Sequence, residues 1–208
     1  MKRNKFILLD RDGVINVEKS YLYKIKDFEY EFGVIKGLKK LKEFGYRFII
    51  ITNQAGIAKG YYTENEYLKL EEFIHSDLLM KGINIEKTYY CPHHPEGLGI
   101  YRKKCSCRKP NIGNFLKAID EFNINIKDSY MLGDRVTDLL PAHKLGLNTV
   151  LLKTGYGKEN ISKLADYNLN SLIVDNILEF VFFNEGYDAE SICKEFYISS
   201  SSLYRIIS

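Results

Sequence analysis

Long apolar segments, charged tracts and proline-rich linkers are missing from this chain of 208 residues. Its apolar runs fall well short of the roughly 20 residues that a membrane-spanning helix needs. At the N-terminus, only four apolar residues separate the basic residues from Asp10, which is too few for the core of a signal peptide. We therefore expect a cytoplasmic protein that does not bind membranes.

Neither the charge nor the pattern of the sequence points to a polymeric partner. The net charge is only +3, because 30 basic residues are balanced by 27 acidic residues spread along the chain. We therefore expect no nucleic-acid partner. Internal repeats are absent, and a hydrophobic content of 45% is enough for one full core. We expect one domain over residues 1–183, followed by a C-terminal helical extension over residues 184–208.

Short apolar runs alternate along the chain with segments of helical spacing. The runs predict strands at 5–9, 46–51, 85–91, 129–132, 148–152 and 172–174. Helices are predicted at 33–45, 63–82, 112–122 and 138–145, the second of them opened by a capping box of Thr63 and Glu66. This alternation predicts an α/β fold, a three-layer Rossmann-like parallel sheet with helices on both faces. In such a fold, functional side chains lie at the carboxyl ends of the strands.

Two acidic residues follow the first predicted strand. Asp10 and Asp12 stand two residues apart, so both can reach one cavity beyond the end of the strand. Two carboxylates this close need a cation, and Mg2+ would satisfy them. Gly13 allows a turn that offers the Asp12 carbonyl as a further ligand. The alternative is a pair of solvated acids in a loop.

Three more polar groups are predicted at the same edge of the sheet. Residues 52–54 (Thr-Asn-Gln) end the second strand and offer hydrogen-bond donors to a phosphate. Arg108 and Lys109 stand ahead of a predicted helix, where a fixed lysine can clamp a phosphate. Asp134 follows the fourth strand and is a further candidate ligand for the cation, whereas Asp138 either caps the next helix or orients Lys109. Each group alone would also fit polar residues exposed to solvent, so it is their occurrence together that indicates a phosphate site.

Three of the four cysteines crowd into one short segment. The sequence C-x-H followed by C-x-C supplies four soft ligands of the kind that close a tetrahedral zinc site, namely Cys91, His93, Cys105 and Cys107. Four protein ligands leave no position for water, so the zinc would be structural and would stiffen the loop over residues 91–107. His93 is preferred to His94, because the intervening proline fixes the turn and His94 points elsewhere.

The sequences DRDGV, TNQ, RKP and GDRVTD, in this order, resemble the four motifs of the haloacid dehalogenase-like (HAD-like) phosphohydrolases over residues 5 to 153. The resemblance implies that Asp10 is a nucleophile that forms an aspartyl-phosphate, and that Asp12 protonates the leaving oxygen and then activates water. It also implies that Thr52 and Lys109 hold the phosphoryl oxygens. The side chains of Asp10, Asp12 and Asp134 are expected to converge around one magnesium ion, which makes the carboxylate a serviceable nucleophile.

Within this superfamily, the cysteine loop together with NQAGIAKGYYTE and CRKP resembles the D-glycero-D-manno-heptose 1,7-bisphosphate phosphatases. The resemblance implies a magnesium- and zinc-binding enzyme that removes the 7-phosphate of a sugar bisphosphate in the synthesis of lipopolysaccharide or surface-glycan precursors. Arg108 would recognise the second charged group of this small substrate. The segments after the first two strands leave little room for a large cap domain. The residues expected to contact the substrate are Glu18, Lys19, Ser20, Tyr21, Asn53, Gln54, Ala55, Arg108 and Arg135.

Three residues depart from the pattern of this family. Lys59 stands where arginine is more common and Arg135 where lysine is common, so both preserve the charge. Pro141 interrupts a predicted helix, and we expect it to delay the start of the helix or to tighten its first turn. None of the three removes a catalytic group.

Two other functions stay open at this point. Histidinol-phosphate phosphatases use the same machinery on an amine-bearing alcohol. A receiver-like signalling module also becomes phosphorylated on an aspartate at the rim of a parallel sheet, although it has no use for Asp12 or for the cysteine loop.

The segment after residue 184 exceeds what a phosphatase core needs. Its apolar residues fit two short amphipathic helices around a serine run, a pattern similar to a helix-turn-helix fragment. Because the segment has few basic residues, packing or a dimer contact is favoured over DNA binding. We expect a monomer, with a dimer through this extension as the alternative.

Overall fold

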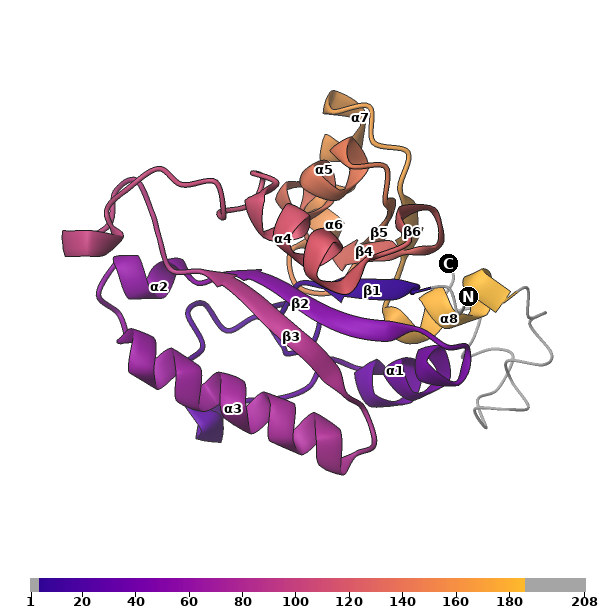
Figure 1. The fold of residues 1–208 in the computed structure, drawn as a ribbon, viewed down its shortest axis with the longest axis horizontal. Helices are drawn as coiled ribbons and strands as arrows, with labels where there is room; N and C mark the ends of the chain where they lie inside the picture. Colours follow the sequence, from indigo (N-terminus) through magenta and orange to yellow (C-terminus); the bar gives the residue numbers. More distant parts are fainter. Residues whose placement is uncertain (1–3, 186–208) are drawn as a thin grey trace.

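The computed structural model of this protein describes residues 4–185, so nearly all of the predicted C-terminal extension lies outside the described residues. The six strands of the described part form one parallel sheet in the order β3-β2-β1-β4-β5-β6 (Figure 1). They are β1 (Phe6–Leu9), β2 (Arg47–Asn53), β3 (Ile85–Cys91), β4 (Tyr130–Gly133), β5 (Asn148–Leu152) and β6 (Leu172–Val174). The predicted parallel α/β fold is confirmed.

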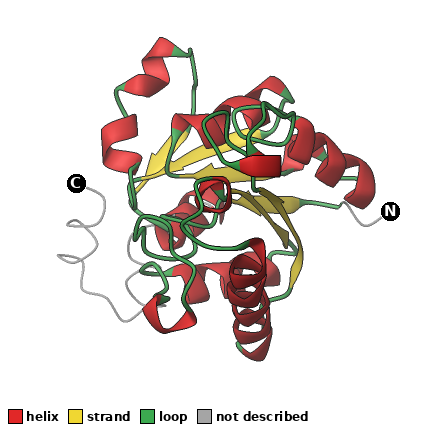
Figure 2. Ribbon diagram, turned by 90° about the vertical axis from the view of Figure 1, so that its left-hand side faces the viewer, coloured by secondary structure: helices red, strands yellow, loops and turns green. Residues whose placement is uncertain are grey.

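Helices cover both faces of the sheet, as Figures 1 and 2 show. One face carries α1 (Val34–Glu43), α3 (Glu64–Met80) and α8 (Ile177–Glu185). The other face carries α4 (Gly113–Phe122), α5 (Val136–Lys144) and α7 (Lys163–Asp166). The sheet therefore separates two hydrophobic cores, which gives the three layers that the sequence predicts.

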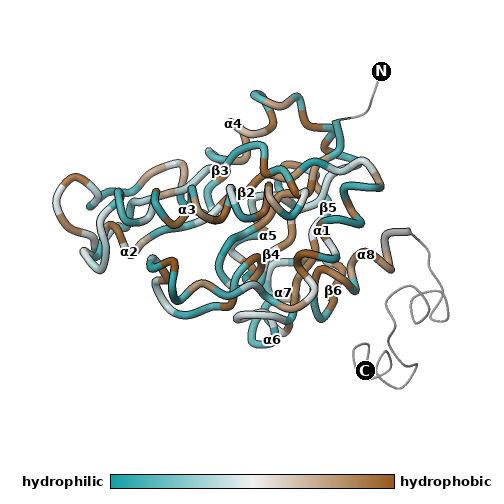
Figure 3. The backbone as a smooth tube through the Cα atoms, turned by 90° about the horizontal axis from the view of Figure 1, so that it is seen from below, coloured by the Kyte–Doolittle hydropathy of each residue, from teal (hydrophilic) through white to brown (hydrophobic). Residues whose placement is uncertain are grey.

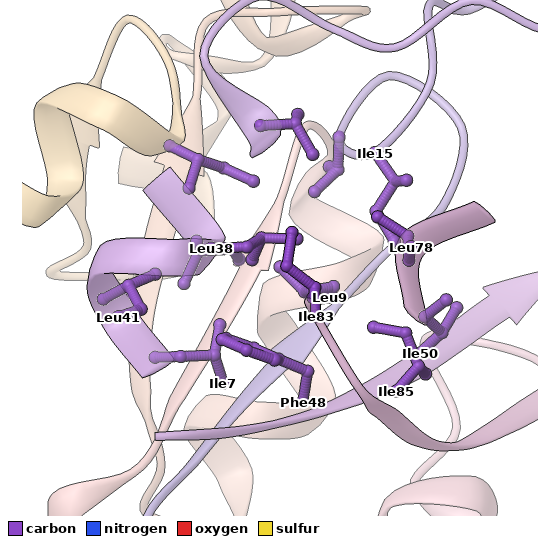
Figure 4. Packing of buried hydrophobic residues seen from close by; sticks show 14 of the residues in the cluster. Ile7, Leu9, Ile15, Leu38, Leu41, Phe48, Ile50, Leu78, Ile83 and Ile85 are labelled. Atoms are coloured by element: carbon purple, nitrogen blue, oxygen red, sulfur yellow. The ribbon is translucent and has the colours of Figure 1, made fainter. Parts of the chain in front are cut away.

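The central strand β1 contributes to both cores. Its four residues are fully buried, and successive side chains alternate between the faces, with Ile7 and Leu9 in one core and Phe6 and Leu8 in the other. Figure 4 shows Ile7 and Leu9 among side chains of α1, α3, β2 and β3. Burial on both faces explains why the sequence of this strand is an unbroken apolar run.

Helix α3 begins with the predicted capping box. Thr63 Oγ1 accepts the N–H of Glu66 at 3.2 Å, and the Glu66 carboxylate accepts the N–H of Thr63 at 2.8 Å. These two bonds satisfy amides that have no partner inside the helix.

Helix α5 begins at Val136, two residues before the predicted start, and contains Pro141 in its interior. The expectation that Pro141 delays the helix is therefore wrong. Asn160 Oδ1 accepts the N–H of Val136 at 3.2 Å, and Asp138 Oδ2 accepts the N–H of Arg135 at 3.0 Å. Because these acceptors satisfy amides at the N-terminus, the first turn forms before the chain reaches the proline.

The sequence did not predict four helices of the described part, α2 (Ala55–Ala58), α6 (Gly157–Asn160), α7 and α8. Figure 3 shows why two of them give no amphipathic signal, because α8 is largely hydrophobic and α6 is hydrophilic. The remaining elements are the short 3-10 turns at Ile25–Asp27, Gly99–Tyr101 and Ile126–Asp128. Within residues 4–185, the segments after β1 and β2 form no large cap domain, and no helix is long and apolar enough to cross a bilayer.

Candidate active site

Residues in the segments that follow β1, β2, β3, β4 and β5 line a cavity of about 480 Å³. Parallel strands bring these distant segments together because all of them end at the same edge of the sheet. The lining residues are Asp10, Asp12, Glu18, Ser20, Tyr21, Asn53, Gln54, Ala55, Lys59, Tyr62, His94, Arg108, Lys109, Arg135, Thr137, Asp138 and Tyr156.

The ammonium group of Lys109 is buried between two carboxylates. Its Nζ lies 2.8 Å from Asp10 Oδ1 and 2.7 Å from Asp138 Oδ1, and it donates to the Ile51 carbonyl at 2.7 Å. The ammonium thus lies within ion-pair distance of both carboxylates and donates one hydrogen bond to the backbone. Asp138 also accepts the N–H of Arg135, so it both caps α5 and orients Lys109.

Three buried acids lie together at this end of the cavity. Carboxylate oxygens of Asp10, Asp134 and Asp138 lie within 4.8 Å of one another. Burial raises the pKa of Asp10 to about 6, while burial and the charges of Asp138 and Asp10 raise that of Asp134 to about 8. Asp134 Oδ1 has no hydrogen-bond partner among the described residues. A buried acid oxygen without a partner, beside other acids, fits an oxygen-preferring divalent cation such as Mg2+.

Two glycines allow the backbone to pass close to Asp134. Gly13 has a φ of +78°, and a Cβ atom on either Gly13 or Gly155 would overlap the Asp134 carboxylate. Thr154 Oγ1 donates to the Gly13 carbonyl at 2.6 Å and holds the turn. Glycine at position 13 is therefore required both by the left-handed turn after Asp12 and by the close approach.

The Asp12 carboxylate lies outside this group of acids and has hydrogen-bond partners of its own. It accepts hydrogen bonds from Arg11 Nη2 at 2.7 and 2.9 Å, from Asn16 at 3.0 Å and from Gln54 at 3.0 Å. Burial alone would raise the pKa of Asp12, but the Arg11 charge and these hydrogen bonds hold it below its ordinary value. This corrects the expectation that the side chains of residues 10, 12 and 134 converge. Arg11 draws Asp12 aside, and Asp138 completes the group instead.

Gln54 connects Asp12 to Thr52. Its Nε2 donates to Asp12 Oδ2 and to Thr52 Oγ1, each at 3.0 Å, and the Tyr62 hydroxyl donates to its Oε1 at 2.6 Å. Because the Thr52 oxygen accepts this bond, its own proton can go to another acceptor. Thr52 is itself buried and does not line the cavity.

Asn53 uses its amide on the backbone of Lys109. Its Nδ2 donates to the Lys109 carbonyl at 3.1 Å, and its Oδ1 accepts the Lys109 N–H at 3.0 Å. This reciprocal pair holds the segment after Arg108 against the end of β2.

A second group of lining residues is mostly cationic. Lys59 Nζ donates to the Tyr21 hydroxyl at 2.8 Å. His94 Nδ1 accepts the N–H of Glu96 at 3.1 Å, so neutral His94 carries its proton on Nε2. Burial and the nearby charges of Arg108 and Lys59 lower the pKa of His94. These side chains therefore form a group that favours an anion.

The loop after β1 places only some of its expected residues at the cavity. Glu18 Oε2 lies 3.8 Å from Arg135, whose guanidinium lies over the ring of Tyr156 at 3.7 Å. Lys19 was expected to contact the substrate but does not line the cavity. Its ammonium is drawn away by Glu29, at 3.0 Å.

The four predicted zinc ligands meet in one cluster. The Sγ atoms lie 3.5 Å apart for Cys91 and Cys105 and 3.2 Å apart for the other two pairs, and His93 Nδ1 lies 3.3 Å from Cys107 Sγ. In a tetrahedral site with Zn–S bonds of about 2.3 Å, the sulfurs lie roughly 3.8 Å apart, so a slight expansion accommodates zinc. These three thiols are free. His94 lines the cavity instead of joining the cluster.

Five lining residues were not expected from the sequence, namely Lys59, Tyr62, His94, Thr137 and Tyr156. Two signals were available. The first is the length of the segment NQAGIAKGYYTE, which is longer than the binding of one phosphate requires and which contains Lys59 and Tyr62. The second histidine of CPHH, His94, follows directly after a predicted zinc ligand.

Two family models match parts of this chain. One is described as HAD-hydrolase-like and matches residues 106–180, and the other is described as an Mga helix-turn-helix domain and matches residues 158–208. The described part of the second range contains β6, which pairs with β5, and α8, which packs in the core with α1. These elements therefore belong to the sheet domain.

Curated relatives match over most of the chain. It is 44% identical over 172 residues to the D-glycero-beta-D-manno-heptose-1,7-bisphosphate 7-phosphatase of Haemophilus ducreyi, covering 81% of this chain and 94% of the relative. It is 42% identical over 183 residues to the D-glycero-alpha-D-manno-heptose-1,7-bisphosphate 7-phosphatase of Photorhabdus laumondii, covering 86% and 100%. Both anomers of the sugar thus occur among the names of its relatives.

A solved structure supports the fold. The D,D-heptose 1,7-bisphosphate phosphatase from B. bronchiseptica, in complex with magnesium and phosphate, matches with a TM-score of 0.75 and 24% identity. The match covers 86% of this chain and 97% of the other.

Proposed function

This chain belongs to the D-glycero-D-manno-heptose-1,7-bisphosphate 7-phosphatase family of HAD-like hydrolases, and we propose that it removes the 7-phosphate of such a heptose bisphosphate through an aspartyl-phosphate on Asp10. One observation carries the proposal. The carboxylate of Asp10, paired with buried Lys109, opens into the same cavity as the cations Lys59 and Arg108 and the Nε2–H donor of His94. A cavity of this kind suits a small substrate with two anionic groups.

Asp10 and Asp12 divide the reaction between them. In the first half, an oxygen of Asp10 bonds to the phosphorus, the bond from phosphorus to the sugar oxygen breaks, and Asp12 gives a proton to that oxygen. In the second half, Asp12 takes a proton from water, whose oxygen attacks the phosphorus and releases phosphate and free Asp10.

The environment of Asp12 fits both of its tasks. Arg11 and the amides of Asn16 and Gln54 lower the pKa of Asp12, which favours the form that accepts a proton from water. The negative charge of an arriving phosphate opposes this effect and favours proton uptake before the first step.

Thr52 and Lys109 stabilise the phosphoryl oxygens. The Thr52 proton is available because its oxygen already accepts from Gln54. Lys109 exchanges one of its present bonds for a phosphoryl oxygen, so it reaches the transition state from a fixed position.

The donor sets fit two metals. Asp10, Asp134 and the Asp12 carbonyl would hold Mg2+, which when bound neutralises part of the charge on the phosphate. Cys91, His93, Cys105 and Cys107 would hold Zn2+, and the closed site would fix the loop that ends at Arg108.

Arg108 meets the second phosphate of the substrate. A guanidinium can bind two phosphate oxygens at once, and Arg108 lies near enough to His94 to lower its pKa. Heptose metabolism in the cytoplasm suits these features, because thiols that bind zinc need a reducing compartment. We propose a monomer, with residues 1–183 as the phosphatase domain.

A substrate panel tests the proposed function. The purified protein with Mg2+ is given both anomers of heptose 1,7-bisphosphate and histidinol phosphate, and phosphorus NMR identifies the phosphate that leaves. We expect loss of the 7-phosphate, with kcat/KM roughly 10- to 100-fold above that for histidinol phosphate, the factor that charge-assisted hydrogen bonds supply. A preference for histidinol phosphate would reject the heptose assignment.

Asp10→Asn provides the control for the chemistry. The amide is nearly isosteric, so we expect folded protein without turnover. Wild-type protein that becomes phosphorylated once and never releases phosphate would instead support the receiver-like alternative.

A further inference from the structure

We propose that Arg11 is the positioning residue that holds the Asp12 carboxylate in place for proton transfer, and that Tyr67 and Glu71 hold Arg11 in turn. This inference rests on the proposed function, in which Asp12 is the proton carrier.

Arg11 is fully buried and grips its neighbour in the sequence. Its Nη2 lies 2.7 Å from Asp12 Oδ1 and 2.9 Å from Oδ2, and its Nε lies 3.2 Å from Oδ1. Asn16 and Gln54 also donate to the same carboxylate, each at 3.0 Å. Both oxygens of Asp12 are therefore fixed, while 19% of its side chain stays exposed at the cavity.

Arg11 also reaches the loop that forms one wall of the cavity. Its Nη2 donates to the Leu22 carbonyl at 3.1 Å. Leu22 directly follows Ser20 and Tyr21, which line the cavity. The same guanidinium thus ties a proton carrier to a wall that faces the substrate.

A second layer fixes the position of Arg11. The ring of Tyr67 lies 5.6 Å from the guanidinium carbon, within the range of a cation–π contact. The Tyr67 hydroxyl donates to Glu71 Oε2 at 2.9 Å, and the other oxygen of Glu71 bonds with His75 at 3.0 Å and accepts from Thr88. Glu71 is thus a buried anion on α3, fixed by His75 of the same helix and by Thr88 of β3, and its charge acts on Arg11 through space.

The contacts of Arg11 fit a role in positioning Asp12 better than a role in stability alone. A buried pair often contributes little to stability compared with apolar side chains of similar volume. Proton transfer, in contrast, requires the donor to be held within about 0.5 Å of its productive position. Arg11 supplies this restraint because a planar guanidinium fixes the direction of a carboxylate, whereas an ammonium supplies only a point charge.

Two substrates with different leaving groups distinguish a role of Arg11 in positioning Asp12 from a general loss of structure. A sugar oxygen leaves with difficulty and needs the proton of Asp12, whereas 2,4-dinitrophenolate leaves readily without one. In Arg11→Met, we expect the first turnover of heptose 1,7-bisphosphate to slow about 100-fold, within the range of general acid catalysis. The first turnover of 2,4-dinitrophenyl phosphate should slow less than about 5-fold and appear as a burst, because the later attack of water also needs Asp12.

Arg47 offers a matched control. It pairs with Glu86 at 3.0 Å and lies over the ring of Phe6 at 4.7 Å, but it stands at the opposite end of β2 from the cavity. Arg47→Met should leave both first turnovers within about twofold of the wild type. Arg11→Lys keeps the charge without the planar fork, so its loss on the bisphosphate should lie between those of wild type and Arg11→Met.

Equal losses on the two substrates in Arg11→Met, or no loss on the bisphosphate, would overturn the inference. If Arg11→Met does not fold, Tyr67→Phe and Glu71→Gln decide, because both keep the packing. They should slow the bisphosphate several-fold more than the aryl phosphate, and a uniform effect rejects the role. Wild-type protein that hydrolyses neither substrate with Mg2+ rejects the proposed function itself, whereas an active wild type with a uniform loss in the variants rejects only the role of Arg11.

Discussion

Lys109→Met removes the only cation that the described structure places between Asp10 and Asp138. The side chain of Lys109 is 1% exposed, and its Nζ lies 2.8 and 2.7 Å from the two carboxylates. Methionine matches the length of the lysine stem but leaves both acids buried without this partner. The substitution therefore tests stability and catalysis together.

The expected magnitude follows from the loss of one member of a buried ion pair. Such a loss costs about 3–5 kcal/mol, a large part of the free energy of unfolding of an ordinary domain. For a chain of this length, 1 kcal/mol shifts Tm by roughly 2–4 °C, so Tm should fall by about 6–20 °C. Catalysis should fall about 100- to 1,000-fold, as it does when one donor to a transition-state oxyanion is removed.

A double-mutant cycle with Asp138→Asn makes the prediction sharper. In the wild-type background, Asp138→Asn removes a partner of Lys109 and should lower the free energy of unfolding. In the Lys109→Met background, the same change removes an unpaired buried charge and should raise it. Urea unfolding measures all four proteins in buffer without magnesium, because a bound divalent cation would neutralise the acids. An effect of Asp138→Asn with the same sign and size in both backgrounds would refute the pairing.

Four further substitutions test other parts of the molecule. Cys107→Ser should reduce the zinc content from one ion per chain to near zero by elemental analysis, whereas Ser106→Ala should retain it, and full zinc content in Cys107→Ser would contradict the site. Thr63→Ala should cost about 1 kcal/mol without changing kcat, and an unchanged Tm would argue against the cap. Gly157→Ala should yield little folded protein by circular dichroism, because its Cβ would overlap a backbone carbonyl oxygen, and normal folding would contradict that packing. Burial would raise the pKa of Glu71, but the hydrogen bonds from His75 and Thr88 lower it, so its contribution to stability is lost as pH falls. Glu71→Gln should therefore flatten the acid side of the stability profile, and an unchanged slope would argue against these bonds.

The sheet was predictable because its strands are short apolar runs, fully buried at β1 and largely buried at β2, β4 and β5. The bounds of β3, β5 and β6 agree with the sequence prediction at both ends. Helix α3 was predictable because a capping box marks its start. The helices α2, α6 and α7 have four residues each, about one turn, so an amphipathic pattern cannot repeat within them. Helix α8 lacks a polar face. The start of α5 could not be predicted from Pro141, because the acceptors that stabilise its first turn include Asn160, which lies far along the chain.

The site was predictable where residues stand directly at the ends of strands. Asp10 directly follows β1, and it meets Lys109 and Asp138 because the segments that follow parallel strands share one edge of the sheet. The orientation of side chains was not predictable in the same way. Asp12 turns toward Arg11, and Lys19 turns toward Glu29, because each finds a partner whose position depends on how the loop folds. Which of several neighbouring polar side chains reaches the cavity is decided by such pairs.

The two hydrogen bonds between the Asn53 side chain and the Lys109 backbone make the position of Lys109 independent of that of Arg108. They anchor Lys109 to β2 without help from the cysteine cluster, whereas Arg108, one residue earlier, is held from the side of that cluster through its contact with the His93 carbonyl. We therefore expect oxidation of the thiols to loosen Arg108, while the bonds to Asn53 keep Lys109 in place. If Arg108 binds the second phosphate as proposed, we expect oxidation to raise KM for a bisphosphate while turnover of simple phosphate esters persists.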